Sequence, residues 1–286
     1  MYYLGFDIGG SIVKAVLIRE KKIIKSKIAD LPDSLAGLLA WLNETKQELI
    51  AGIEKEIAGV GFAVAGVLNT ERSKMLKSPN INFLDGQPLG ELFQSIVQPY
   101  PIKIEHDAHC FLVAEADVGL VKNLKNVFYL TIGTGIGGAW MVDGKICYGA
   151  HGSAGEVGHT IVDIQNKYDL EDIAANKLIK RELGIGSIEA LKRAREGDKE
   201  CQDIFKKVGK NLGVGLANII NIFDPEVIVL NGGISEAQDL ILPAIEEGIE
   251  EFVVSPAARK TKILFSQLGL EGGALGAALL FEADIK

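Results

Sequence analysis

Two glycine-rich turns, one in each half of the chain, carry the residues best suited to bind phosphate. The first is Gly9-Gly10-Ser11, which closely follows Asp7, and the second is the segment 133–138, which contains Thr134. Glycine lets backbone N–H groups approach an anion closely, and the hydroxyl groups add further donors. Each turn lies between two apolar segments that predict strands. A single turn of this kind is equally well explained as a plain β-hairpin, but two similar turns suggest two lobes that grip one nucleotide.

The second turn also fits the dinucleotide pattern, with glycines at 133, 135 and 138. A Rossmann motif must be followed by a helix, whose N-terminus holds the pyrophosphate. Here the segment 139–142 predicts a strand, and Asp143-Gly144 predicts a tight hairpin turn. We therefore reject NAD binding. An Asp at a strand end beside a phosphate turn can hold Mg²⁺, usually through water, and Asp7 has that position.

The elements that must position these turns alternate between strand and helix along most of the chain. Apolar runs predict strands over residues 2–7, 12–18, 23–29, 57–64, 101–105, 127–132, 139–142, 145–147, 227–230 and 262–265. Helical spacing predicts helices over 32–50, 89–97, 107–120, 169–183, 187–196, 200–223 and 236–252, and from Gly272 onward. This order is typical of an α/β protein. We expect an N-terminal lobe over 1–106 and a C-terminal lobe over 107–286, with the last helix able to pack back on the first lobe.

Composition narrows the classes of protein and partner. The chain has 286 residues, 48% hydrophobic and 24% charged, which is typical of a folded protein long enough for two domains. The net charge of -8 argues against a nucleic-acid partner, which normally faces a basic patch. Cys110, Cys147 and Cys201 are scattered, as in a reducing compartment. We see neither a leader segment nor a membrane span and expect a cytoplasmic protein.

Three acidic and imidazole side chains have the chemistry to bind a polyol. Asp107 follows a predicted strand and begins a helix, where it could serve as a general base or simply cap the helix. Glu156 and His159 lie in a glycine-rich loop. A carboxylate can accept from two adjacent hydroxyls and an imidazole can bond a third, although an ordinary surface turn explains the pair equally well.

Four motifs together resemble the ROK (repressor, ORF, kinase) family of sugar kinases, part of the actin-like ATPase superfamily. They are Asp7-Ile8-Gly9-Gly10-Ser11, Glu105-His106-Asp107-Ala108, the glycine turn 133–138, and Gly152-Ser153-Ala154-Gly155-Glu156-Val157-Gly158-His159. The resemblance runs nearly from end to end, and the last motif is its most specific part. It implies a two-lobed α/β fold of the actin-like ATPase (ribonuclease H-like) type, with ATP and sugar in the cleft between the lobes. It also implies a homodimer.

The resemblance assigns roles to individual residues. Asp107 matches the family's catalytic base. Sugar contacts are expected from Asn80, His106, Asp107, Glu156, His159 and Glu171. Nucleotide contacts are expected from Asp7, Gly9, Gly10, Ser11, Lys14, Gly133, Thr134, Gly135, Gly137, Gly232 and Gly233. Glu171 could equally stabilise the first turn of its helix, Asn80 could serve only a turn, and Gly232-Gly233 could be a plain strand–helix turn.

Two departures from the family pattern bear on the substrate. His106 stands where the family usually has Asn, which offers the sugar a donor and an acceptor with a different reach. Many members have a cysteine-rich zinc segment after the motif His, but residues 161–168 contain no cysteine, so we expect no zinc site.

We expect an ATP- and Mg²⁺-dependent kinase of a hexose, glucokinase-like, with an N-acetylhexosamine or fructose as the nearest alternative substrate. A non-catalytic sugar sensor is one rival, although the first hairpin begins at Leu4 and leaves no room for preceding DNA-binding helices. An actin-like ATPase acting on proteins is another, but it has no use for the Glu156/His159 loop. The sequence does not name the sugar or the hydroxyl.

Overall fold

The computed structural model describes residues 1–283 and divides the chain into two compact units. Unit 1 contains residues 1–123, 144–154 and the C-terminal segment from 267 onward, and unit 2 contains residues 124–143 and 155–266. This division differs from a single cut after residue 106, because the helix that begins at Asp107 and residues 144–154 belong to unit 1. The last helix also belongs to unit 1, in line with the expectation that it can pack back on the first lobe. Residues 284–286 of the predicted C-terminal lobe lie outside the described part.

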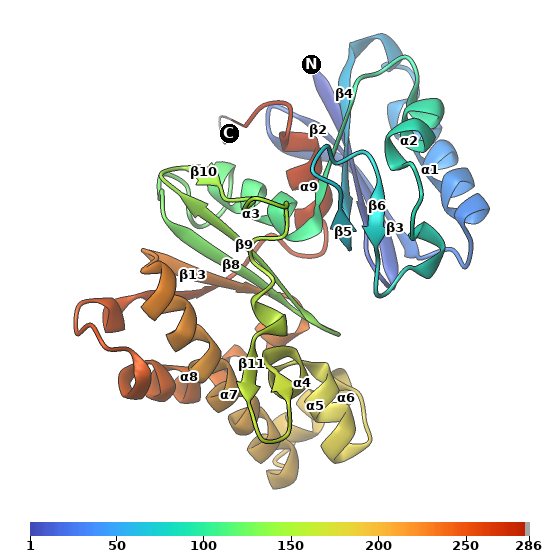
Figure 1. Ribbon diagram of the computed structural model, residues 1–286. Helices are drawn as coiled ribbons and strands as arrows, with labels where there is room; N and C mark the ends of the chain where they lie inside the picture. Colours follow the sequence, from blue (N-terminus) through green and yellow to red (C-terminus); the bar gives the residue numbers. More distant parts are fainter. Residues whose placement is uncertain (284–286) are drawn as a thin grey trace. The chain divides into compact units, whose positions relative to one another are not determined.

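Unit 1 is built on a sheet with the strand order β3-β2-β1-β4-β7. Figure 1 labels β2, β3 and β4 of this sheet. Its elements are β1 (Tyr2–Ile8), β2 (Ile12–Arg19), β3 (Lys22–Asp30), α1 (Leu35–Ile50), β4 (Ile57–Val64), β5 (Val67–Leu68), β6 (Met75–Lys77), α2 (Leu89–Val97), β7 (Ile102–His106), α3 (Asp107–Asp117), β10 (Lys145–Ile146) and α9 (Gly272–Leu279), with short 3-10 turns at Glu54–Glu56 and Asn82–Leu84. The first three strands are antiparallel, whereas β4 and β7 run parallel to β1.

Helices cover both faces of this sheet. Leu4, Phe6 and Ile8 of β1 point into a core that α1 and α2 complete. The alternate residues of β1 face α9, as the period of two in a strand requires. A Cβ on Gly5 would lie 2.0 Å from the Ala274 carbonyl oxygen, so glycine is what lets α9 sit so close to the sheet. This packing places the N-terminal end of α9 beside Asp7.

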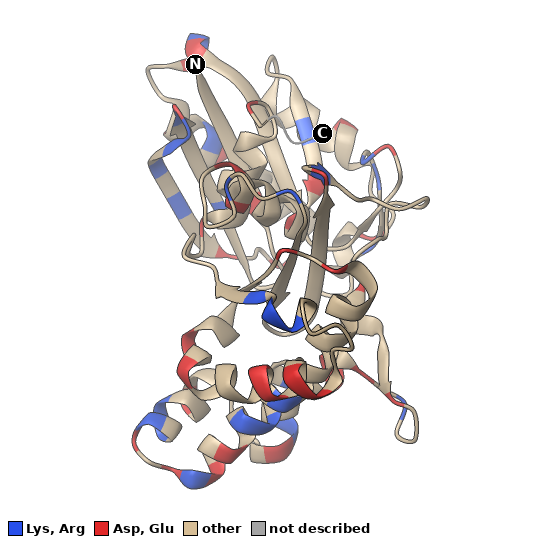
Figure 2. Ribbon diagram, turned by 90° about the vertical axis from the view of Figure 1, so that its left-hand side faces the viewer, with Lys and Arg blue, Asp and Glu red and all other residues tan. Residues whose placement is uncertain are grey.

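Unit 2 has a sheet whose strands run in the order β9-β8-β13-β14. Its elements are β8 (Val127–Ile132), β9 (Ile136–Val142), β11 (Ile161–Asp163), β12 (Tyr168–Asp169), α4 (Leu170–Ala174), α5 (Asn176–Leu183), α6 (Ser187–Arg195), α7 (Lys199–Phe223), β13 (Val227–Asn231), α8 (Gln238–Phe252) and β14 (Lys262–Phe265), with 3-10 turns at Val157–His159, Gly233–Ala237 and Ala258–Lys260. The long helix α7 packs on α8 over an apolar core shared with the sheet. Lys and Arg alternate with Asp and Glu along many helical turns, as Figure 2 shows for one side.

Two predicted elements differ from the structure in an informative way. The second strand of the second hairpin begins at Ile136 and not at Ala139, because Gly137 and Gly138 pair with Thr131 and Leu130. The helix predicted over 169–183 is two helices, separated by extended backbone at Ala175. That break points the backbone N–H of Asn176 at the Gly133 carbonyl oxygen, 3.1 Å away. The glycine turn and the helices after it are therefore joined.

Candidate functional site

The first glycine turn joins β1 to β2 in unit 1. The Gly9 N–H donates to the Ile12 carbonyl at 3.1 Å and closes the hairpin. Gly10 and Ser11 are exposed, and their N–H groups make no hydrogen bond within residues 1–283. Asn80 lies against this turn, since a Cβ on Gly10 would come within 2.6 Å of the Asn80 Cβ. The structure thus brings Asn80 to a turn with two amide donors available for an anion.

Asp7 of β1 and Lys14 of the adjacent strand β2 form a buried ion pair. They are directly opposite in the β1–β2 register, and Lys14 Nζ donates to Asp7 Oδ2 at 2.7 Å. Burial raises the pKa of the Asp7 carboxyl above its ordinary value, and the attraction of Lys14 opposes this shift without cancelling it. Lys14, expected at the nucleotide, contacts the carboxylate next to the turn. Its charge is therefore already engaged.

The surroundings of Asp7 suit Mg²⁺ bound through water. Mg²⁺ commonly uses one or two carboxylates and leaves its remaining positions to phosphates and water. A Cβ on Gly273 would lie 2.5 Å from Asp7 Oδ2, so glycine is what keeps a side chain out of the space next to this buried oxygen. Within residues 1–283, no group of three or more His, Cys, Asp and Glu side chains is arranged to hold a metal ion. Asp7 would therefore hold such an ion together with substrate phosphates and water.

Asp107 is the first residue of α3, directly after the end of β7. Its Oδ1 accepts the Ala108 N–H at 2.9 Å and lies 3.3 Å from His106 Nε2. Its Oδ2 makes no hydrogen bond within the described residues, and 24% of the side chain is exposed. The N-cap residue is His106, and its side chain makes no capping bond. Asp107 is thus the first helical residue and not the N-cap that the sequence offered as an alternative, because the helix begins one residue earlier than that role requires. Its Oδ1 accepts the Ala108 N–H, and its Oδ2 stays compatible with the role of a base.

The second glycine turn, in unit 2, is three residues long and joins β8 to β9. The Gly133 N–H donates to the Gly135 carbonyl at 2.9 Å. The Thr134 and Gly135 N–H groups have no partner within the described residues, and Thr134 is exposed. Gly137, expected in the turn, is a strand residue opposite Thr131. This turn, like the first, offers two adjacent amide donors.

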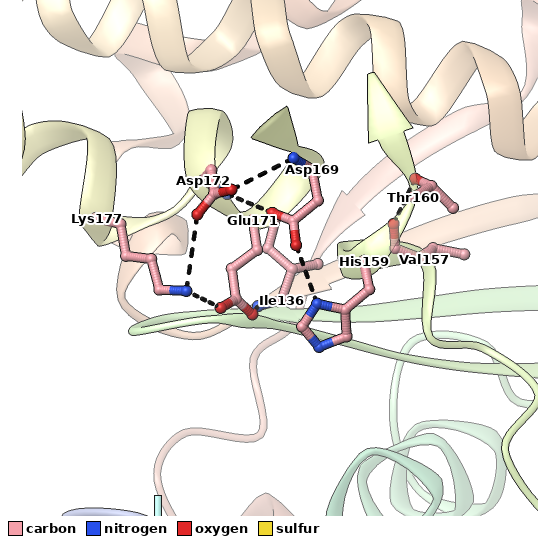
Figure 3. Close-up of polar contacts among 8 residues, drawn as sticks. All are labelled: Ile136, Val157, His159, Thr160, Asp169, Glu171, Asp172 and Lys177. Atoms are coloured by element: carbon pink, nitrogen blue, oxygen red, sulfur yellow. Dashed lines mark hydrogen bonds and ion pairs between the residues drawn. The ribbon is translucent and has the colours of Figure 1, made fainter. Parts of the chain in front are cut away.

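Glu171 of α4 binds this turn through its carboxylate (Figure 3). Its Oε2 accepts the Ile136 N–H at 2.8 Å, and its Oε1 is paired with Lys177 of α5. A Cβ on Gly135 would lie 2.2 Å from Glu171 Oε2, so only glycine permits this approach. Glu171, which the sequence predicted to contact the sugar, is thus hydrogen-bonded next to the turn predicted to bind phosphate. Each carboxylate oxygen can still accept from a second donor.

His159 and Asp169 form a second pair beside it, also drawn in Figure 3. His159 Nδ1 lies 3.1 Å from Asp169 Oδ2, and the His159 side chain is 57% exposed. The hydrogen bond with Asp169 raises the pKa of His159, against a smaller opposite effect of burial. Asp169 fixes the ring through Nδ1 and leaves Nε2 for a ligand. Glu156 is exposed at the start of the same short 3-10 turn.

Gly232 and Gly233 follow β13 and lie beside the second turn. Gly232 has φ of 94°, and a Cβ there would be 2.4 Å from the Ile132 carbonyl oxygen. Gly233 borders a cavity of about 620 Å³ in unit 2. Its lining includes Asn176, Leu191, Lys192, Arg195, Phe205 and Ile234. Because the Asn176 N–H is bonded to the Gly133 carbonyl, this partly apolar cavity adjoins the phosphate turn.

Sequence reasoning missed several of these partners. Asn176 and the cavity that α6 lines have no local signal, because each depends on contacts between segments distant in sequence. Lys177 is only six residues from its partner Glu171, but the two lie on separate helices where the sequence predicted one. Arg72 and Tyr148, which contact Glu105 next to the Asp107 corner, are further examples.

Comparison with known proteins identifies the family. The sequence model of the ROK family matches residues 3–284, and the chain belongs to this family. A ROK family glucokinase from Streptomyces griseus, solved in complex with glucose and AMPPNP, superposes with a TM-score of 0.84 at 25% identity, covering 98% of this chain and 99% of that one. The predicted α/β fold of the actin-like ATPase type is confirmed.

Relatives in the family have different activities. The N-acetyl-D-glucosamine kinase of Vibrio parahaemolyticus is 28% identical, over 98% of this chain and 99% of its own length. The xylose repressor of Caldicellulosiruptor bescii is 26% identical, over 99% of this chain and 78% of its own length. Family membership thus supports a sugar kinase, and it includes repressors as well. No helix within residues 1–283 is long and apolar enough to cross a membrane.

Proposed function

We propose that this protein is an ATP-dependent kinase that phosphorylates a hydroxyl of a hexose, as a glucokinase does. The observation that carries the proposal is Asp107, a carboxylate at a rigid strand–helix corner with Oδ2 uncommitted. In phosphoryl transfer, most of the catalysis comes from placing the acceptor alcohol in line with the donor and from stabilising charge. Asp107 takes the proton of the acceptor hydroxyl as the new O–P bond forms, while the bond from the γ-phosphorus to the bridging oxygen breaks and ADP leaves.

The donor side draws on features in each unit. In unit 2 the Thr134 and Gly135 amides bind phosphate oxygens, and the cavity next to Gly233 receives the adenosine. In unit 1 the Gly10 and Ser11 amides serve the same purpose. Asp7 holds Mg²⁺ through water, and Lys14 keeps that carboxylate in place. Bound Mg²⁺ neutralises negative charge on the phosphates.

The sugar side uses polar groups suited to several hydroxyls. Glu156, and His159 through Nε2, reach outward from the loop before β11. Glu171 accepts a hydrogen bond from a sugar hydroxyl, because the Ile136 N–H and Lys177 leave other lone pairs of its carboxylate available. His106 and Asn80 complete the set of proposed contacts. We further propose a cytoplasmic homodimer without nucleic-acid or membrane partners, as the family resemblance and composition suggest.

A panel of sugars tests this proposal. Glucose, mannose, fructose and the N-acetylhexosamines are each supplied with ATP and Mg²⁺, and both ADP release and sugar phosphate are measured. The proposal expects sugar-dependent ADP release matched by equal sugar phosphate. N-acetylhexosamine or fructose as the best substrate would change the sugar but not the reaction type. ADP release that is indifferent to sugar would instead indicate a protein-directed ATPase.

One second function has support from a relative, the xylose repressor. In that case the chain binds a sugar without phosphorylating it, and His106 in place of the usual Asn is the feature that favours it. Calorimetric binding of a sugar, with no sugar phosphate formed from ATP, is the result that would select this function.

A further inference from the structure

Glu105 has a buried carboxylate that lies within 3.1 Å of four polar groups, in three hydrogen bonds and one ion pair. Only 6% of its side chain is exposed. Its Oε1 accepts the His106 N–H at 2.8 Å and lies 3.0 Å from His109 Nδ1. Its Oε2 lies 2.9 Å from Arg72 Nε and accepts from the Tyr148 hydroxyl at 3.1 Å. All of these residues belong to unit 1. No step of the proposed reaction uses Glu105 itself.

The Oε1 half of this network encloses the corner where Asp107 stands. The His106 N–H belongs to the last peptide of β7, immediately before Asp107. His109 lies on the first turn of α3, two residues after Asp107, and its ring is 3% exposed. Glu105 Oε1 thus contacts the residue before the proposed base, His106, and the residue two positions after it, His109. The direction in which Asp107 presents Oδ2 depends on these two contacts of Glu105.

The Oε2 half connects the corner to two other segments. Arg72 comes from the loop after β5, where it has φ of 53°, a conformation uncommon for a residue with a side chain. Its guanidinium lies over the Tyr148 ring, 3.9 Å from the centroid. The Tyr148 ring in turn meets the edge of His109 at 5.0 Å and an interplanar angle of 90°. Tyr148 precedes the loop that bears Glu156.

The charge of Glu105 is what this arrangement needs. Burial alone raises the pKa of the Glu105 carboxyl, but the hydrogen bond and charge of His109, the charge of Arg72 and the His106 N–H together lower it. The carboxylate is therefore ionised and can accept on both oxygens. A glutamine of the same size cannot do so, because its NH₂ group would face donors on one side. Neither Arg72 nor a backbone N–H can switch to accepting.

We propose that Glu105 is a positioning residue for Asp107, acting through the His106 N–H and His109, with Arg72 and Tyr148 as its supports. This inference rests on the proposed kinase function. It assigns to four residues outside the reacting groups the task of aiming the base at the acceptor hydroxyl. A displacement of about 1 Å at such a group can lower the rate about 100-fold.

The test is Glu105→Gln, with Glu115→Gln as the matched control. Glu115 is a fully buried residue of α3, the helix that begins at Asp107, and it accepts the Leu120 N–H at 2.8 Å. In Glu105→Gln the amide oxygen should stay beside the guanidinium of Arg72, whose positive charge attracts an oxygen and repels an NH₂ group, so the NH₂ group opposes the His106 N–H. We expect kcat to fall at least about tenfold, with the sugar Kd unchanged within about threefold. Glu115→Gln should lower the Tm comparably while kcat stays within about twofold.

A second substitution separates positioning from simple damage. In Glu105→Gln/Arg72→Met the amide can turn its oxygen to the His106 N–H and its NH₂ group to the Tyr148 oxygen. We expect this double variant to recover most of the lost kcat, whereas a merely structural role predicts further loss. A kcat of Glu105→Gln within twofold of wild type, or equal kcat losses in Glu105→Gln and Glu115→Gln, overturns the proposal.

Failure of the proposed function gives a different result. If wild type phosphorylates no sugar, the kinase proposal fails first. Amide hydrogen exchange then decides on Glu105 by itself: exchange over residues 106–109 should accelerate in Glu105→Gln and not in Glu115→Gln. Unchanged exchange in both variants would contradict the claim that Glu105 holds this corner.

Discussion

The buried Asp7–Lys14 pair gives the most direct prediction of stability. Lys14→Met keeps most of the aliphatic stem but removes the charge, and it leaves Asp7 ionised without a partner. The side chains are 9% and 3% exposed for Lys14 and Asp7, so the value for breaking a buried pair applies, about 3–5 kcal/mol, and not the surface value of about 0–1. At about 2–4 °C per kcal/mol, the Tm of unit 1 should fall by roughly 6–20 °C.

The assay must report unit 1 alone, because two units can unfold separately. The chain has two tryptophans, Trp41 in α1 of unit 1 and Trp140 in β9 of unit 2. In a Trp140→Phe background, Trp41 fluorescence follows unit 1 during denaturant unfolding. Lys27→Met is the control, because it breaks a partly exposed pair with Glu48 in the same unit and should cost less than about 1 kcal/mol.

The dependence on pH has a definite sign. Burial raises the pKa of Asp7 in the folded protein above its ordinary value of 3.8. The contribution of Asp7 to stability is therefore fully present below pH 3.8, and it is lost as pH rises through the raised pKa of the folded protein. Without Lys14 this pKa rises further. The deficit of Lys14→Met should therefore be smallest near pH 4 and grow toward pH 7, and Asp7→Asn should relieve most of it. A deficit below 1 kcal/mol at pH 7, or one that does not change with pH, would refute the reasoning.

Two further predictions concern unit 2. Gly135→Ala should displace Glu171 from the turn amide and cost about 1.5–3 kcal/mol by Trp140-monitored unfolding, because a Cβ would lie 2.2 Å from Oε2. Gly133→Ala in the same turn meets no atom within 4 Å and should change stability by less than about 0.5 kcal/mol, so equal losses would contradict this explanation. The pKa of His159, followed by NMR, should lie above 6.5 and fall in Asp169→Asn, since Asp169 raises it. The pair's stabilisation is then full below pH 6.5 and lost as pH rises through the raised pKa, and an unchanged pKa in Asp169→Asn would argue against the bond.

The sequence predicted the strands and helices well where the pattern was local. The apolar run 57–64 and the helix 89–97 have the predicted bounds. The strand is buried along nearly its whole length and reads as a continuous apolar run, and the buried residues of the helix recur every four positions. The start of β9 was predicted too late, since Gly137 and Gly138 have low strand propensity and only pairing with β8 makes them strand residues. The break at Ala175 likewise depends on a bond to a turn 40 residues earlier.

The sequence predicted the motifs of the candidate site but not the residues from other segments that hold those motifs in place. Asp107, Glu156 and His159 lie in motifs that the family resemblance identifies. The carboxylate of Glu105 stands in the same motif, yet its role becomes visible only with Arg72 and Tyr148, which come from distant segments. Such contacts are set by packing, and no local pattern records them.

The measurement that bears most directly on the kinase proposal compares wild type with Asp107→Asn. The best sugar from the panel is used twice, once for calorimetric binding and once for sugar phosphate formation with ATP and Mg²⁺. Asn keeps the size of Asp107 but cannot take the hydroxyl proton. The proposal predicts that sugar binding persists within a few-fold while sugar phosphate formation falls by about 100-fold or more. Equal rates of phosphorylation in the two proteins would contradict the role of Asp107.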